Sequence, residues 1–141
     1  MKYIHYKQGY KYQLVKDYSL IIPIKPKAVL RSSEGWLCLT TKGQLLIKKG
    51  YAWDGPSGPA LDTPTFMRAS LIHDACYQLM REGKLESIQY RDAVDKMLPE
   101  HCLEDGMSRL RAWYTYKAVC MFGGGAIDPL NIKKVIIAPG R

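Results

Sequence analysis

Short apolar stretches separated by turn residues fill the first fifty positions of the chain. Apolar and polar side chains alternate in part over 10–16, and short apolar runs follow at 19–24, 28–30, 36–41 and 45–47. β-branched and aromatic residues are frequent in these runs, which favours strands. Thr41-Lys42-Gly43-Gln44 is typical of a tight hairpin between the last two runs. The pattern therefore predicts an N-terminal antiparallel β-sheet.

A segment rich in glycine and proline interrupts this pattern. Residues 50–60 contain three glycines and two prolines, which excludes a helix and disfavours a long strand. Thr63 followed by Pro64 is typical of a helix N-cap and of the first helical position. We expect a loop here and a helix directly after it.

Apolar residues recur at helical spacing beyond the loop. The first helix is predicted over 64–81, and His73 falls on its apolar face. A second helix is predicted over 87–98, with Ser87 as its N-cap and Pro99 at its end. Both helices are expected to pack against the sheet or against each other through these faces.

A third helix is predicted over 106–122, with Gly123 as its C-cap. Its apolar stripe consists of Leu110, Trp113, Tyr114, Cys120 and Met121. Residues 133–138 are expected to return as an edge strand.

These patterns predict an α+β fold in a single domain. The chain has 141 residues, enough for one core, and its 47% hydrophobic and 24% charged residues are typical of globular proteins. No apolar run reaches the ~18 residues of a membrane span, and the N-terminus lacks the apolar segment of a secretory signal. Large multidomain enzymes, membrane proteins and low-complexity chains are therefore excluded. The domain is divided into a β-rich basic part, a Gly/Pro loop, a helical part and a C-terminal tail or edge strand, over 1–50, 51–62, 63–125 and 126–141.

Positive charge is concentrated at the start of the chain. The formal net charge is +8, and the first fifty residues hold ten basic and two acidic residues, whereas 51–141 hold eleven of each. Such a field attracts polyanions, so nucleic acid, an anionic membrane surface and an acidic protein are candidate partners. Lys7, Lys11 and Lys16 alternate with tyrosines and are the candidate contacts to nucleic acid or another polyanion. An ordinary half-exposed sheet face is the alternative.

The four cysteines are scattered without a paired motif. This spacing matches neither a zinc ribbon nor a disulfide framework. We expect reduced, mostly buried thiols.

His73 is the first candidate for chemistry. An imidazole on a buried face needs a hydrogen-bond partner, and the adjacent Asp74 points about 100° further around the helix, so it is not expected to pair with His73. Asp95 borders the inward face of the second helix and is the expected partner. A carboxylate that orients an imidazole raises its basicity and leaves the other nitrogen to act as a base or to bind metal. His73 and Asp95 are thus candidate catalytic residues; a structural pair joining two helices is the alternative.

The Gly/Pro loop supplies a second candidate. Asp54 lies in a turn, and Gly55 allows close approach of backbone groups to a ligand. Asp54 and Asp74 are candidate metal ligands for Ca²⁺ or Mg²⁺, and with His73 the set would also accept Zn²⁺. Ser57 lacks the strand-turn-helix context of a nucleophile elbow. A simple turn capped by Asp54 is the alternative.

The order of motifs resembles a family of uncharacterised phage and prophage proteins. The shared motifs are Gly50-Tyr51-x-x-Asp54-Gly55-x-Ser57-x-Pro59, His73-Asp74-x-x-Tyr77, Arg91-x-x-x-Asp95 and Phe122-Gly123. The resemblance implies a phage-related origin, with phage structural proteins or a host macromolecule as partners. It also implies a location in the cytoplasm of an infected or lysogenic bacterial host, or in the virion.

A shorter string, His73-Asp74-Ala75-Cys76-Tyr77, is similar to the active-site helix of secreted phospholipases A2. The likeness implies that His73 is the base, that Asp74 binds Ca²⁺ together with a preceding loop, and that Asp95 supports His73. The cysteine-rich glycine loop and the flanking disulfide cysteines of that family are missing from this chain.

Two classes of function follow from these features. In the first, the chain is a small phage-related hydrolase with a His-Asp site, assisted or not by a divalent metal. In the second, it is a non-catalytic virion component, or a protein that binds a host factor or nucleic acid, and the His-Asp cluster is structural.

Overall fold

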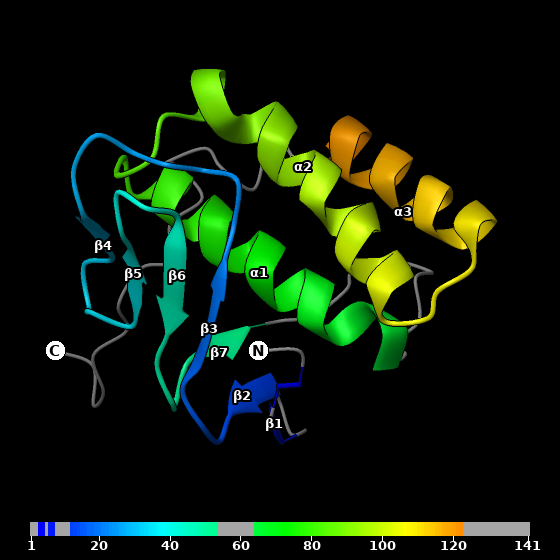
Figure 1. Ribbon diagram of the computed structural model, residues 1–141, viewed down its shortest axis with the longest axis horizontal. Helices are drawn as coiled ribbons and strands as arrows, with labels where there is room; N and C mark the ends of the chain where they lie inside the picture. The colour runs from blue at the N-terminus through cyan, green and yellow to red at the C-terminus, as the bar shows by residue number, and fades with distance from the viewer. Residues whose placement is uncertain (1–2, 5, 8–11, 54–63, 123–141) are drawn as a thin grey trace, which may run out of the picture.

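The computed structural model describes residues 3–4, 6–7, 12–53 and 64–122, and it confirms the α+β fold (Figure 1). Antiparallel strands come first along the chain, and helices follow. The strands are β1 (Tyr6–Lys7), β2 (Tyr12–Leu14), β3 (Tyr18–Ile21), β4 (Leu30–Arg31), β5 (Leu37–Leu39), β6 (Gln44–Ile47) and β7 (Ala52–Trp53). The helices are α1 (Pro64–Arg81), α2 (Ser87–Glu104) and α3 (Arg109–Phe122).

The strands form two sheets, whereas the sequence predicted one. The first has the order β1-β2-β7, and the second has the order β3-β6-β5-β4. β7 lies within the segment predicted to be a loop, and β1 was not predicted. Strands of two residues are too short to show an alternating pattern.

The two sheets are halves of one interrupted antiparallel ribbon. Residues 12–21 pair with residues 44–53 at both ends of the ribbon. In the middle, Gly50 adopts a φ of +96°, which glycine tolerates because it has no Cβ. The backbone N–H of Lys49 there donates to a carboxylate oxygen of Asp17 at 2.7 Å. A side-chain bond thus takes the place of a ladder bond where the ribbon divides.

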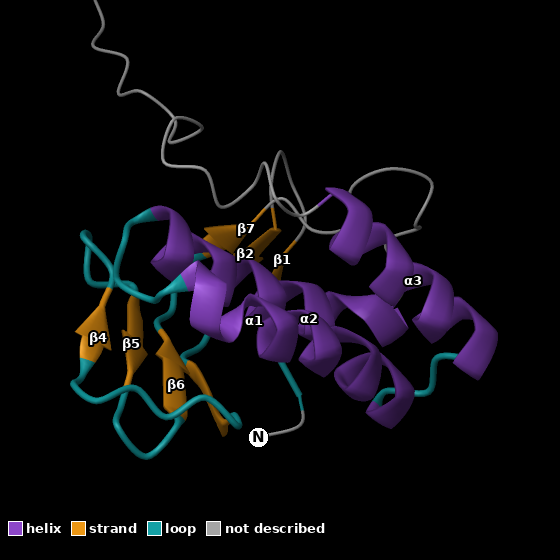
Figure 2. Ribbon diagram, turned by 90° about the horizontal axis from the view of Figure 1, so that it is seen from above, coloured by secondary structure: helices purple, strands orange, loops and turns teal. Residues whose placement is uncertain are grey.

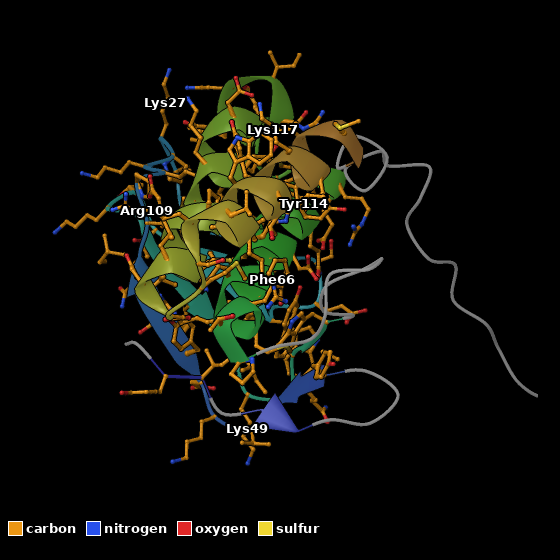
Figure 3. All side chains as sticks on the ribbon, turned by 90° about the vertical axis from the view of Figure 1, so that its right-hand side faces the viewer. Lys27, Lys49, Phe66, Arg109, Tyr114 and Lys117 are labelled. Atoms are coloured by element: carbon orange, nitrogen blue, oxygen red, sulfur yellow. The ribbon has the colours of Figure 1, made fainter. Side chains whose placement is uncertain are left out.

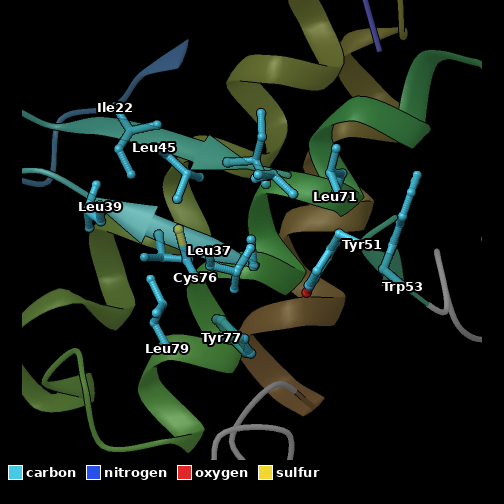
Figure 4. Packing of buried hydrophobic residues seen from close by; sticks show 14 of the residues in the cluster. Ile22, Leu37, Leu39, Leu45, Tyr51, Trp53, Leu71, Cys76, Tyr77 and Leu79 are labelled. Atoms are coloured by element: carbon cyan, nitrogen blue, oxygen red, sulfur yellow. The ribbon is translucent and has the colours of Figure 1, made fainter. Parts of the chain in front are cut away.

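The main core lies between the four-stranded sheet and α1. Alternate residues of β5 and β6 are buried, as expected for strands with one covered face: Leu37, Leu39, Leu45 and Ile47. Leu71, Cys76 and Leu79 of α1 belong to the same cluster and lie against these strands (Figure 4). The sheet thus fixes which side of α1 faces away, towards α2.

The predicted hairpin joins β5 to β6. These strands pair antiparallel, with Leu39 opposite Leu45, and the N–H of Gly43 donates to the carbonyl of Thr40 at 3.0 Å. Gly43 has a φ of +87°, and a Cβ built on it would lie 2.5 Å from the carbonyl oxygen of Ile22. The turn therefore needs glycine both for its backbone angle and for the close approach of the neighbouring strand.

α1 has the bounds that the periodicity predicted. Thirteen of its 18 residues are buried, because the sheet covers one side and α2 the other (Figure 2). Gly83, two residues after the end of the helix at Arg81, has a φ of +73° and donates its N–H to the carbonyl of Met80 at 3.0 Å. His73 lies on the inward side of α1, as predicted.

The predicted start of α2 at Ser87 is confirmed, but its predicted end before Pro99 is wrong. The helix continues through Pro99 to Glu104, and the N-cap is Glu86 rather than Ser87, without a side-chain capping bond. Proline removes one backbone donor, but burial of His101 and Cys102 beyond it favours continuation of the helix. Tertiary packing here outweighs the local preference of proline.

α3 begins three residues later than predicted, at Arg109. Gly106 lies before it with a φ of +99°, and the Ser108 hydroxyl accepts the backbone N–H of Arg111 at 3.3 Å. The predicted apolar stripe faces away from the core, whereas Ala112 and Thr115 are buried.

None of the described helices is long and apolar enough to cross a membrane. Thr63, Gly123 and residues 133–138 lie outside the described residues.

Candidate active site

His73 of α1 and Asp95 of α2 are in contact, as the helical phase predicted. The Nε2 atom of His73 lies 2.9 Å from the Oδ1 atom of Asp95, and the two side chains come from adjacent packed helices. The two residues are 7% and 2% exposed. A carboxylate only accepts hydrogen bonds, so Nε2 carries the hydrogen and the Nδ1 atom of neutral His73 keeps its lone pair.

Tyr77 and Arg91 complete the surroundings of Asp95. The Tyr77 hydroxyl donates to the same Oδ1 atom, and the Nε atom of Arg91 lies 3.6 Å from Oδ2. Tyr77 lies one helical turn after His73, and Arg91 lies one turn before Asp95, so each pair shares a helix face. Burial and the contact with Asp95 raise the pKa of Tyr77, which keeps its hydroxyl protonated as a donor.

Tyr77 and Arg91 belong to motifs that the sequence shows, but neither was predicted to be a site residue. The spacing of four residues in His-x-x-x-Tyr and Arg-x-x-x-Asp was the available signal. This spacing predicts that Tyr77 lies beside His73 and that Arg91 lies beside Asp95. Both then come together if the two helices pack through these faces.

Asp74 lies closer to His73 than expected. Its Oδ1 atom is 4.0 Å from Nδ1 of His73, within the range of an ion pair, and its side chain is 36% exposed. The expectation that these neighbours do not pair is therefore wrong: the carboxylate of Asp74 lies near Nδ1, and that of Asp95 lies at Nε2. The imidazole is flanked by one carboxylate on each nitrogen.

Two carboxylates change the acidity of His73. Burial lowers the pKa of the imidazole, but Asp74 and Asp95 outweigh burial and hold the pKa above its ordinary value of 6.5. The charged imidazolium is thus stabilised by anions on both sides. This arrangement favours protonation of His73 at Nδ1.

The neighbouring polar side chains also belong to this region. The Tyr51 hydroxyl donates to the Oε1 atom of Gln78 at 2.9 Å, and burial together with the charge of Asp74 raises the pKa of Tyr51. Burial raises the pKa of the Cys76 thiol to about 12. Cys76 therefore stays a thiol at neutral pH and does not provide a nucleophile.

Several predicted site residues fall outside the described part of the chain. Asp54, Gly55, Ser57 and Lys11 lie there, and of Lys7 only the backbone is described. Lys16 is described and its side chain is exposed. The polyanion-binding surface, the loop contacts and the loop metal ligand therefore stay predictions.

Asp74 is the predicted metal ligand that can be placed. Among the described residues, no group of three or more His, Cys, Asp or Glu side chains could hold a metal ion. These side chains alone do not fit a cation, which would need additional oxygen ligands.

Comparisons of the chain with protein-family models, curated proteins and solved structures found no match. The resemblances to phage proteins and to phospholipases A2 stay predictions. The geometry of the site is that of an imidazole held at Nε2 by one carboxylate, with its Nδ1 edge beside a second, partly exposed carboxylate.

Proposed function

We propose that the chain is a small phage-related hydrolase in which His73 acts as the general base. The observation that supports this proposal is the contact between His73 Nε2 and Asp95, which directs the proton-accepting Nδ1 atom towards the partly exposed Asp74. Asp95 fixes the tautomer and the ring orientation. Tyr77 and Arg91 hold the carboxylate of Asp95 in turn.

In the proposed reaction, Nδ1 of His73 accepts a proton from a water molecule as the oxygen of that water attacks the substrate. The same proton is then donated to the leaving group, so that His73 returns to its neutral form. Asp95 and Asp74 stabilise the transient imidazolium, because each places a negative charge beside one ring nitrogen. The second carboxylate is the feature that a purely structural His–Asp pair does not require.

The burial of the pair favours the alternative function. His73 and Asp95 are largely inaccessible to solvent, and such a pair could serve to join α1 to α2. In that case the chain is a non-catalytic virion component, or a protein that binds a host factor or nucleic acid. Uncharged variants of His73 and Asp95 distinguish the two functions. They should lower turnover if the pair is catalytic, and they should lower only stability if the pair is structural.

Hydrolysis of a panel of chromogenic carboxylic esters, thioesters and phosphodiesters by the purified chain tests the proposal. His73→Gln is expected to lower kcat by at least about 10²-fold, because general-base catalysis contributes that much. His101→Gln is the matched control, since His101 is a second buried histidine on α2. It should change kcat little.

Asp95→Asn and Tyr77→Phe separate positioning from stability. Both variants keep the shape of the side chain, so circular dichroism should show a folded protein while kcat falls. Absence of turnover by the wild-type chain over the whole panel would contradict the hydrolase. Equal activity of wild type and His73→Gln would do the same, and would leave the structural function.

A divalent metal belongs to the proposal only as an added factor. Ca²⁺, Mg²⁺ or Zn²⁺ that binds the folded state should raise the Tm, because preferential binding stabilises that state. Asp74→Asn should remove this gain, so that the Tm of the variant with each cation equals its own Tm in EDTA. A Tm that none of the three cations changes would remove the metal from the proposal and leave the His–Asp base.

A further inference from the structure

α3 turns its most apolar side towards solvent. Leu110, Trp113, Tyr114 and Met121 are 77%, 56%, 55% and 73% exposed, whereas the buried side of the helix carries Ala112 and Thr115. The four exposed residues follow the spacing i, i+3, i+4 and i+11, which places them on one face. We call them, together with Lys117, the outer face of α3. A helix with its larger apolar side chains outward is unusual for a surface that contacts water alone.

The outer face of α3 is also basic. Lys117 lies in the middle of it, seven residues after Leu110 and four before Met121, and its Nζ atom lies 5.8 Å from the centre of the Trp113 ring. Arg109 is exposed one turn before Trp113 (Figure 3). The sequence of α3 contains no acidic residue. The partner of this face should therefore be both negatively charged and able to accept apolar side chains.

We propose that the outer face of α3 binds the surface of an anionic lipid membrane. Trp and Tyr prefer the level of the lipid headgroups, where their rings are half buried and their polar groups reach water. Lys117 and Arg109 would contact lipid phosphates, while Leu110 and Met121 insert between the headgroups. At 14 residues, α3 would lie along the surface rather than cross it.

The position of Lys117 argues against a second copy of the chain as the partner. In a symmetric dimer, a residue at the centre of the contact meets itself across the two-fold axis. Two lysines would then approach each other where water is excluded, and like charges there are destabilising. The same residue favours an anionic surface.

The aliphatic residues argue against nucleic acid. Trp113 and Tyr114 could stack on bases, and Lys117 could contact phosphate. Leu110 and Met121 are the most exposed apolar members of the face, however, and neither stacks on bases nor donates a hydrogen bond. Lipid gives these two side chains an apolar environment, and single-stranded nucleic acid does not.

Vesicle co-sedimentation of the full chain tests the proposal. Vesicles of phosphatidylglycerol and phosphatidylethanolamine should bind the protein, and vesicles of phosphatidylcholine alone should bind it far more weakly. Leu110→Ser combined with Met121→Ser should weaken binding by about tenfold or more, because two apolar side chains lose their burial. Ile21→Ser combined with Ile88→Ser is the matched control, since both isoleucines are exposed on other elements. It should leave binding unchanged.

Quenching of tryptophan fluorescence by brominated lipid places the contact. Quenching should be lost in Trp113→Phe and kept in Trp36→Phe, because Trp36 directly precedes β5, and β5 lies at the side of the molecule opposite α3 (Figure 1). Lys117→Glu should abolish binding to anionic vesicles, and Lys117→Arg should retain it.

Several outcomes would overturn the proposal. The first is that the protein does not bind vesicles. The second is that the two double serine variants lose vesicle binding equally, and the third is that Trp113→Phe leaves the quenching intact. Dimerisation abolished by Leu110→Ser would instead assign the face to a second copy. Binding of single-stranded DNA through Trp113, without vesicle binding, would assign it to nucleic acid.

Discussion

At the scale of single residues, His73 shows how two neighbours decide the acidity of a buried group. Burial alone would lower the pKa of the imidazole, yet Asp74 and Asp95 keep it raised. The folded chain therefore binds a proton more tightly at His73 than the unfolded chain does. The stabilisation from this proton is fully present below the unfolded pKa of about 6.5 and is lost as the pH rises through the folded pKa.

This linkage predicts the effect of Asp74→Asn on stability. The variant lacks the anion beside Nδ1, so its folded His73 pKa should lie closer to 6.5 than that of the wild type. The wild type should exceed the variant in free energy of unfolding below about pH 6.5, and this difference should disappear as the pH rises. Urea unfolding over a pH series measures it. In a His73→Gln background the effect of Asp74→Asn should not depend on pH; a dependence that persists there would assign the linkage to another group.

At the scale of elements, backbone conformation and packing contribute separately to the turns. Gly43 and Gly35 both have positive φ angles, of +87° and +79°. A Cβ on Gly43 would lie 2.5 Å from the carbonyl oxygen of Ile22, whereas a Cβ on Gly35 would have no heavy atom within 4 Å. The hairpin between β5 and β6 is therefore constrained by its neighbour as well as by its own geometry.

The two glycines form a matched pair for a stability test. Gly35→Ala should lower the free energy of unfolding by about 1 kcal/mol, which is the cost of a left-handed conformation. Gly43→Ala should lower it by about 2–3 kcal/mol, because the backbone of Ile22 must also move. Chemical denaturation of both variants gives the comparison. Equal losses would show that the close approach to Ile22 does not contribute.

At the scale of the whole molecule, Arg68 connects three elements. From α1 it donates to Asp105 at 2.9 Å, to Glu104 at the end of α2 at 2.7 Å and to the Tyr18 hydroxyl of β3 at 3.3 Å. These contacts hold the pKa of the guanidinium above its usual range, although burial opposes the charge. An open surface pocket of about 510 Å³ borders the same cluster. No periodic pattern along the chain predicts this contact.

Arg68→Met is therefore expected to be strongly destabilising. The variant leaves the carboxylate of Asp105 without its partner, which should lower the free energy of unfolding by about 3 kcal/mol. Glu104 contributes less, because its side chain is 61% exposed and screened by water. Arg31→Met, at an exposed position of β4, should change stability by no more than about 0.5 kcal/mol in urea unfolding. Similar losses in both variants would contradict the linking role of Arg68.

Local sequence patterns alone determined the class of fold and two residues of the candidate site, His73 and Asp95. Periodicity of 3.6 residues identified α1 and turned His73 inward, and the turn residues around Gly43 predicted the hairpin. The same helical periodicity also indicated Asp95 as the partner of His73, because both residues lie on the faces through which α1 and α2 pack. These features depend on residues close in sequence, so they can be recognised without knowing what packs around them.

Only the tertiary structure decided the features that depend on distant neighbours. α2 continues through Pro99, because the packing of later residues outweighs one missing donor. The outer face of α3 points to solvent, because α3 contacts α2 through the side that carries its smaller residues. Periodicity predicts which residues form an apolar stripe, but not whether that stripe faces the core or the solvent. Tyr77 and Arg91 meet at Asp95 for the same reason: helical spacing fixes which residues share a face, and the packing of one helix on another fixes what that face meets.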